Sequence, residues 1–177
     1  GIALGSVRIV DAAHSHDSAA KAVALVRAGE AEMLMKGSLH TDELMAAVVK
    51  RDTGLRTGRR VSHCFIMDVP AIDRVVIITD AAVNIFPTLE DKVHIVQNAI
   101  DLAHALGLEQ PKVAILSAME TINPQVPSTI EAAALCKMAD RGQITGGILD
   151  GPLAFDNAIS VEAAKTKNVR SAVAGQA

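Results

Sequence analysis

Short, almost continuous apolar runs that alternate with longer amphipathic stretches constrain the fold of this chain most strongly. The runs RVVIITD and KVAILS, residues 74–80 and 112–117, are almost wholly apolar until each ends at a small polar residue. Such runs are typical of strands in a parallel sheet that helices cover on both faces, because neither face of the strand meets water. The alternation therefore predicts an α/β fold of repeated βαβ units with a mostly parallel sheet.

Composition narrows the function classes as well as the core. Half of the 177 residues are hydrophobic, but only three are aromatic and none is Trp or Tyr, so the core must be aliphatic. A net charge of −3 gives no broad attraction to nucleic acid or anionic lipid, and platforms for base stacking are missing. Nucleic acid is therefore not an expected partner. A membrane is not expected either, because no run reaches the roughly 18 apolar residues that a membrane span needs.

Periodicity and capping signals place the expected elements. Thr88 and Asp91 form a capping box in front of an apolar stripe that runs to Gly107. Ser128 and Glu131 form a second box after Pro127. Further helices are predicted at about 18–28 and 41–50, and another begins near Asn157. Strands are predicted near residues 7–10, 32–35, 62–68, 75–79, 113–117 and 147–149.

The first candidate site is the turn in the stretch MLMKGSLHTDELM, residues 33–45. An expected strand ends at Lys36, Gly37 and Ser38, and an expected helix begins after His40 at Thr41. A lysine, hydroxyl groups and backbone N–H groups at a helix N-terminus suit phosphate oxygens. The turn lacks the GxxxxGK[ST] pattern of a Walker loop, and a plain capped connection between two elements is the alternative.

Three further junctions carry polar residues that should lie at the same edge of a parallel sheet. Asp80 and Asn84 follow the strand at 75–79, and Ser117 follows the next strand and opens a long polar loop. Gly151 ends the last expected strand, and Asp156 opens the helix after it. These side chains could orient a substrate, although Asp156 is also explained as a helix N-cap.

Other reactive residues form no recognisable site. The two cysteines, Cys64 and Cys136, lie among apolar neighbours without a CxxC motif, which favours buried thiols in a reducing, cytoplasmic setting. His14 and His16 form a weak metal pair without a third ligand, so no metal site is predicted. The basic loop at 51–60 is interpreted as solvated. We also expect both ends of the sequence to lie inside a longer chain.

Longer stretches of the sequence resemble a known family. The segments MKGSLHTDELM, RTGRRVSHCFIMDVP, ITDAAVNIFPTLEDKVHIVQNAIDLAHALG, PKVAILSAMETINPQVPSTIEAAALCKMADRGQITGGILDGPLAFDNAIS and SAVAGQA resemble the phosphate acetyl/butyryltransferase family, in order and over nearly the whole chain. The TDAAVN form is similar to phosphate butyryltransferases, because acetyltransferases commonly carry Cys at the position of Ala81. The sequence also resembles the transferase part of bacterial proteins in which an enoyl-CoA hydratase domain precedes it.

The resemblance implies an enzyme that reversibly transfers an acyl group between coenzyme A and inorganic phosphate. It implies a three-layer α/β/α fold similar to isocitrate and isopropylmalate dehydrogenases, with two subdomains around a cleft, and a homodimer. Acyl-CoA and phosphate would be substrates, no tightly bound cofactor is implied, and a hydratase domain could be fused to the full chain. The turn at Lys36 to Thr41 suits such chemistry.

The resemblance also limits what these residues can be expected to do. The family's Ser-Arg and Asp, which bind phosphate and assist the leaving thiolate, lie beyond the C-terminus of this sequence, so catalytic residues stay unassigned. Residues 1–177 would be the central part of a transferase domain, and such a fragment could be inactive. A non-catalytic acyl-CoA-sensing or assembly domain is therefore the alternative function. A generic nucleotide-binding or sugar-phosphate-binding domain is a weaker one.

Overall fold

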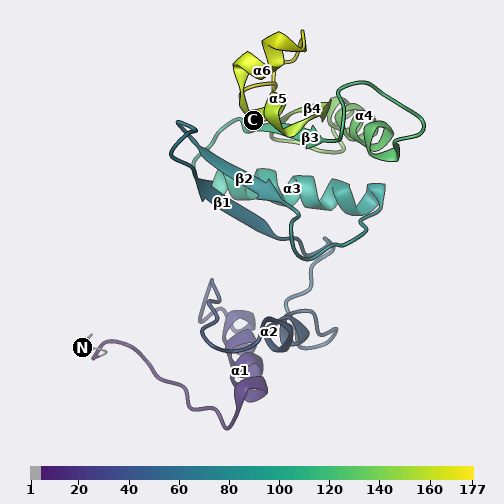
Figure 1. The fold of residues 1–177 in the computed structure, drawn as a ribbon. Coiled ribbons are helices and arrows are strands. Elements are labelled where there is room, and N and C mark those ends of the chain that lie inside the picture. Colours follow the sequence, from purple (N-terminus) through teal and green to yellow (C-terminus); the bar gives the residue numbers. More distant parts are fainter. Residues whose placement is uncertain (1–4) are drawn as a thin grey trace. The chain divides into compact units, whose positions relative to one another are not determined.

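The computed structural model describes residues 5–177 and divides the chain into two compact units. The N-terminal unit comprises Gly1–Arg59 and the C-terminal unit comprises Arg60–Ala177 (Figure 1). Each unit is described by itself. No helix of the described part of the chain is long and apolar enough to cross a membrane.

Two helices make up the regular structure described in the N-terminal unit, α1 (Ser15–Arg27) and α2 (Thr41–Val48). Both were expected, and they pack against one another. The imidazole Nδ1 of His14 accepts a hydrogen bond from the backbone N–H of Asp17 at 3.2 Å, which caps α1. The helices are thus fixed by local signals that the sequence carries.

The strands expected near 7–10 and 32–35 are wrong. Both segments lack strand structure, because no described segment forms a ladder with either of them. An extended segment without a partner leaves its backbone groups to water and its apolar side chains uncovered. Met33 and Met35 are accordingly 83% and 87% exposed.

The C-terminal unit begins with an antiparallel pair, β1 (Cys64–Asp68) and β2 (Val75–Thr79). The strands expected at 62–68 and 75–79 are therefore confirmed, but they pair with each other as a hairpin and not through a parallel crossover. The short turn between them explains the difference, because a parallel connection needs a dozen or more residues.

A parallel pair follows, formed by β3 (Lys112–Leu116) and β4 (Ile148–Leu153). Helix α4 (Pro127–Asp140) connects them and packs against both, which is the expected βαβ unit. The chain is thus an α/β protein with a parallel sheet, as predicted. Strand β4 extends beyond the expected 147–149.

One of the two predicted capping boxes is confirmed and the other is wrong. Helix α3 (Leu89–Ala105) begins at the Thr88 and Asp91 capping box, as expected. Helix α4 instead has Val126 as its N-cap and Pro127 at its first position, so the Ser128 and Glu131 box is wrong. Proline suits that position, since the missing N–H is unpaired there in any helix.

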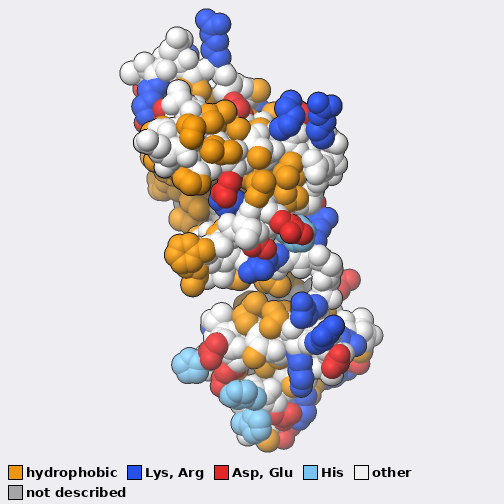
Figure 2. Space-filling model, turned by 90° about the vertical axis from the view of Figure 1, so that its right-hand side faces the viewer, with side chains coloured by type: hydrophobic (Ala, Val, Ile, Leu, Met, Phe, Trp, Pro, Cys, Tyr) orange, Lys and Arg blue, Asp and Glu red, His pale blue; other side chains and the backbone are white. Residues whose placement is uncertain are grey.

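The core of the C-terminal unit is aliphatic, as expected. One buried cluster joins α3 and α4 beside the parallel pair and contains Val96, Ile100, Leu135 and Ile144. A second cluster contains Leu153, Ala164, Val173 and Ala174 and anchors the last helix, α6 (Val161–Thr166), which follows the short helix α5 (Phe155–Ile159). Apolar side chains also reach the surface of both units (Figure 2).

Candidate functional site

The turn before α2 is exposed at Lys36, Gly37 and Ser38, and no strand precedes it. The Lys36 ammonium donates a hydrogen bond to the backbone carbonyl of Leu39 at 3.1 Å, so it folds back over its own turn. His40 is the N-cap of α2 and Thr41 is the first residue of that helix. The structure thus gathers the five predicted residues at one helix N-terminus.

Glu43, which the sequence did not single out, holds this helix end in place. Its carboxylate accepts hydrogen bonds from the backbone N–H of His40 at 3.3 Å and from the Ser15 hydroxyl at 2.8 Å. The His16 ring nitrogen Nδ1 lies 3.3 Å from the same carboxylate. Glu43 therefore connects the start of α2 to the start of α1 and stabilises the helix dipole from its positive end.

Asp80, directly after β2, organises the loop that follows that strand. Its carboxylate accepts hydrogen bonds from the backbone N–H groups of Ala82, Val83 and Asn84 at 3.1–3.2 Å and also from the Asn84 side chain. Burial raises the pKa of this carboxyl, but the hydrogen bonds outweigh burial and the pKa of Asp80 is lowered overall. Asp80 and Asn84 are thus brought together, as expected, and they fix the shape of the loop.

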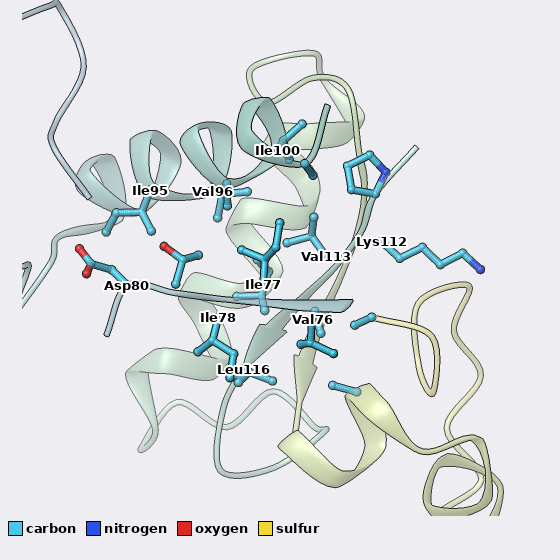
Figure 3. Close-up of a pocket in the computed structure, with 18 of the residues that line it drawn as sticks. Val76, Ile77, Ile78, Asp80, Ile95, Val96, Ile100, Lys112, Val113 and Leu116 are labelled. Carbon is cyan, nitrogen blue, oxygen red and sulfur yellow. The ribbon is translucent and has the colours of Figure 1, made fainter. Parts of the chain in front are cut away.

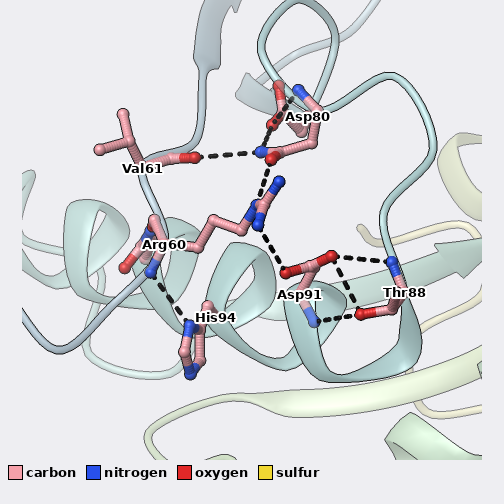
Figure 4. Close-up of polar contacts among 8 residues, drawn as sticks. Arg60, Val61, Asp80, Thr88, Asp91 and His94 are labelled. Carbon is pink, nitrogen blue, oxygen red and sulfur yellow. Dashed lines mark hydrogen bonds and ion pairs between the residues drawn. The ribbon is translucent and has the colours of Figure 1, made fainter. Parts of the chain in front are cut away.

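Arg60 joins this loop to α3 (Figure 4). Its guanidinium donates to the Asn84 amide oxygen at 2.6 Å and lies 3.2 Å from the Asp91 carboxylate. The backbone N–H of Arg60 donates to Nδ1 of His94 at 3.0 Å. Sequence reasoning missed this role, because the basic loop at 51–60 gives no signal that its last arginine is held by partners distant in the sequence.

Ser117, directly after β3, is held at the carboxyl end of the parallel pair. Its N–H donates to the Leu153 carbonyl at 2.9 Å, and its hydroxyl lies 2.8 Å from the Ser128 hydroxyl at the start of α4. The buried Thr129 hydroxyl, in α4, accepts a hydrogen bond at 2.9 Å from the N–H of Asn123 in the loop that precedes this helix. The long polar loop is therefore fastened to the first turn of α4.

Gly151 and Asp156 have structural roles that the sequence did not predict. A Cβ on Gly151 would lie 2.6 Å from the Ile115 carbonyl oxygen, so this glycine permits the close approach of β4 to β3. Asp156 is not the N-cap of α5, because Ala154 occupies that position. The Asp156 carboxylate instead accepts from the N–H of Asn157 at 2.9 Å and lies 3.4 Å from the Lys167 ammonium.

A polar cluster beside Asp156 was also missed. The Lys167 ammonium donates to the Glu120 carboxylate at 3.0 Å, and that hydrogen bond is the main cause that lowers the pKa of Glu120. The buried Asn157 amide donates to the same carboxylate, while its own Oδ1 has no hydrogen-bond partner among the described residues. The cluster joins the loop after β3 to α5 and α6, across a distance in sequence that no local motif reveals.

One cavity connects several of these junctions within the C-terminal unit. Asp80 at the end of β2, Leu116 at the end of β3, Ser128 at the start of α4 and Phe155 in α5 all line it. Both strands line the cavity along their whole length, and the convergence of Asp80 with Ser117 stays a prediction. Lys36 to Thr41 belong to the N-terminal unit, so they remain a separate group.

The Cys136 thiol is not activated as a nucleophile. Both cysteines are free and partly exposed, so the expectation that they are buried is wrong in degree. Burial is the main cause that raises the pKa of Cys136 to about 11, which keeps this thiol protonated at neutral pH. Among the described residues, no group of three His, Cys, Asp or Glu side chains could hold a metal ion.

Comparison with known proteins assigns the fold and its junctions to a family. The family described as Phosphate acetyl/butaryl transferase matches residues 6–177. The chain belongs to this family.

Individual members of the family show how much of a full-length protein the chain represents. It is 67% identical to the phosphate acetyltransferase of Rhizobium meliloti over 98% of this chain and 55% of that protein. It is 46% identical to the phosphate butyryltransferase of Clostridium acetobutylicum over its whole length and 59% of that protein. The crystal structure of a branched-chain phosphotransacylase from Enterococcus faecalis V583 superimposes with a TM-score of 0.85 at 34% identity, over 95% of this chain and 60% of that one. The chain thus spans a little more than half the length of these relatives.

Proposed function

We propose that the protein supplies the substrate-binding core of a phosphate acyltransferase, which reversibly transfers an acyl group between coenzyme A and inorganic phosphate. The observation that carries this proposal is the 67% identity to the Rhizobium meliloti phosphate acetyltransferase over 98% of the chain. Because that relative is an acetyltransferase and a 46% identical relative is a butyryltransferase, acetyl-CoA is the first substrate to test and butyryl-CoA the second.

The proposed reaction is a direct attack of phosphate on the thioester. A phosphate oxygen forms a bond to the acyl carbonyl carbon and loses a proton to a base, and the carbon–sulfur bond breaks to release the coenzyme A thiolate. The protein must bring two anionic reactants into one geometry and stabilise the charge on the carbonyl oxygen and the sulfur. Such a site needs phosphate-binding groups that are placed before the substrates arrive.

The turn before α2 is the proposed phosphate or coenzyme A contact. Lys36, Gly37 and Ser38 are exposed, and His40 and Thr41 open a helix whose first N–H groups have no acceptor within the helix. Among the described residues, Lys36 donates only to a carbonyl of its own turn, and turning toward a phosphate would exchange this neutral acceptor for a charged one. Glu43 supports the proposal by fixing the helix end beneath the turn.

The junctions of the C-terminal unit are proposed to form further substrate contacts of their own. Asp80 and Asn84 would hold the loop after β2 in its bound form, since their polar atoms are already hydrogen-bonded within it. Ser117 offers a hydroxyl whose partner, Ser128, lines the cavity. Gly151 would allow β4 to lie close to β3 beside this cavity, and Asp156 would hold the start of α5 there.

The family suggests further properties of the full-length protein. We propose a three-layer α/β/α architecture like that of isocitrate and isopropylmalate dehydrogenases, with residues 1–177 as the central part of the transferase domain and two subdomains around the cleft. We further propose that the full-length protein is a cytoplasmic homodimer that needs no tightly bound cofactor. An enoyl-CoA hydratase domain is proposed to be fused to the full chain.

A chimera tests the function. Residues 1–177 replace the matched region of the Rhizobium meliloti enzyme, and free thiol is measured after acetyl-CoA or butyryl-CoA is mixed with phosphate. We expect phosphate-dependent thiol release within about tenfold of the parent enzyme, a difference of about 1.4 kcal/mol in activation free energy. A folded chimera that binds acyl-CoA by calorimetry but releases no thiol would contradict the proposal and favour an acyl-CoA sensor.

A further inference from the structure

A largely aliphatic cavity of about 630 Å³ lies within the C-terminal unit. Strands β2 and β3 border it, with side chains of α3 above the strands in the view of Figure 3. Val76, Ile77 and Val113 are among the residues that surround it. A volume of this size holds about 20 water molecules at liquid density. Water in such a space would leave a large apolar surface without the stabilisation that burial provides.

The lining pattern shows which part of each strand meets the cavity. Every residue from 74 to 80 and every residue from 111 to 116 lines it. Successive side chains of a strand point to opposite faces, so a cavity against one face would be lined by alternate residues only. The cavity therefore lies along the edges of β2 and β3, where backbone groups as well as side chains reach it.

Both edges are unpaired among the described residues. Strand β2 pairs with β1 alone, and β3 pairs with β4 alone, so the two sheets stay separate. An open strand edge presents a row of N–H and C=O groups and is a ready template for another strand. The cavity is thus bordered on two sides by backbone that can pair with an extended segment.

The remaining walls indicate which side chains such a segment would carry. Buried side chains of Ile95 and Ile100 from α3, Ala132 and Leu135 from α4, and Ala158 from α5 line the cavity. Charged groups of Lys112 and Arg74 also lie along it. A strand between β2 and β3 would meet aliphatic side chains, and buried strands of α/β proteins are accordingly rich in Val, Ile and Leu.

We propose that this cavity receives an aliphatic β-strand from the part of a full-length phosphate acyltransferase that lies outside these 177 residues. The strand pairs with β2 along one edge and with β3 along the other, which joins the two sheets into one. Relatives have the necessary length, because the chain covers only 55% of the Rhizobium meliloti enzyme and 50% of the Rickettsia felis enzyme. The proposal rests on family membership and not on catalytic activity.

Hydrogen exchange of the 177-residue protein and of the chimera with the Rhizobium meliloti enzyme tests the pairing. We expect the amides of β2 and β3 that face the cavity to exchange at least tenfold more slowly in the chimera, whether or not it is active. Equal exchange in both proteins would overturn the proposal. Protection in the isolated protein that rises with its concentration would also overturn it, because a second copy would then fill the cavity.

A pair of substitutions in α3 gives an independent test by thermal unfolding. Ala99→Leu adds bulk at a buried position that lines the cavity, and Ala105→Leu adds the same bulk at an exposed position outside it. In the 177-residue protein, Ala99→Leu should leave the melting temperature unchanged or raise it, since it fills space. In the chimera it should lower the melting temperature by about 3 °C or more, because the strand occupies that space. The Ala105→Leu control should have little effect in either protein. A similar loss from Ala99→Leu in both would contradict the proposal.

Discussion

The N-terminal unit contains two helices and no paired strand among its described residues, whereas the C-terminal unit contains two sheets. The contrast follows from where each element finds its hydrogen bonds. A helix satisfies its backbone within one segment, while a strand must find a partner segment. Apolar segments at 7–10 and 32–35 of the first unit have no such partner, while β3 and β4 find one another through α4. Pairing, and not strand propensity, decides which apolar runs become sheet.

The largest expected effect comes from disrupting the pairing of β3 and β4 in the C-terminal unit. Gly151→Val places a side chain against the Ile115 carbonyl and Cβ, at 2.6 and 2.8 Å from the position of its own Cβ. Because a backbone atom cannot be displaced at a low energetic cost, we expect a loss of about 3 kcal/mol or more in the free energy of unfolding, measured by urea titration.

Its control is Gly58→Ala, which meets nothing within 4 Å. That variant should stay within about 0.5 kcal/mol of the unchanged protein. Hydrogen exchange should locate the loss from Gly151→Val in β3 and β4 and leave α1 unaffected. Equal loosening of both units would contradict their separate stabilisation.

Removal of Asp80 should weaken the loop after β2 by an intermediate amount. Asp80→Ala leaves three backbone N–H groups and the Asn84 amide without their acceptor, so a loss of about 1–3 kcal/mol is expected at pH 7. The pKa of Asp80 is lowered in the folded state, so its stabilisation is present above the ordinary pKa of about 3.9 and disappears as the pH falls through the folded value.

The pH dependence of the variant checks this assignment. The difference between the unchanged protein and Asp80→Asn, measured by urea unfolding, should shrink between pH 5 and about pH 2. Asp91 and Glu120 also have lowered pKa values, so the unchanged protein should still lose stability in acid through those groups when Asp80 is replaced. A constant difference across this range would show that the charge of Asp80 is not what holds the loop.

Lys36→Ala should affect activity and not stability. The ammonium is exposed and, within the part of the chain that the structure describes, bonds only to the Leu39 carbonyl, so the free energy of unfolding should change little. In the chimera, loss of a charge-assisted contact should reduce kcat/KM for phosphate roughly 5- to 150-fold. This corresponds to a loss of about 1–3 kcal/mol in transition-state stabilisation. Lys50→Ala, an exposed lysine at the other end of the α2 segment, is the matched control. Unchanged phosphate kinetics would make the turn a plain connection between elements.

The smallest expected effects come from the removal of one helix cap in each unit. His14→Ala removes a single hydrogen bond to the Asp17 N–H and should cost about 0.5–1 kcal/mol. Thr88→Ala removes the partner of Asp91, which also holds Arg60, and should cost more, about 1–2 kcal/mol. Urea titrations of both variants measure the difference. Equal costs would show that the Arg60 contact adds nothing to the cap.

Local signals in the sequence located α1 to α4 and four strands, but the single helix predicted from near Asn157 is two short helices, α5 and α6. The Thr88 capping box and the apolar stripe after it located α3, because both are set by residues within one segment. Periodicity could not show that β1 and β2 pair as a hairpin, or that 7–10 and 32–35 find no partner, since pairing depends on the rest of the chain.

The candidate site was predictable to the same extent. Residues at strand ends, such as Asp80 and Ser117, could be recognised because an apolar run ends directly before each of them. The partners that hold them could not. Arg60 reaches Asn84 across 24 positions, and Lys167 reaches Glu120 across 47 positions. Such contacts arise from folding and leave no local pattern.

A crystal structure of the chimera with phosphate and coenzyme A bound would test most directly the claim that this chain provides the phosphate-binding half of an acyl-transfer site. The account predicts a phosphate ion against Lys36 and the N–H groups at the start of α2, with the coenzyme A sulfur beside it. An occupied site elsewhere, with this turn still folded onto the Leu39 carbonyl, would contradict it.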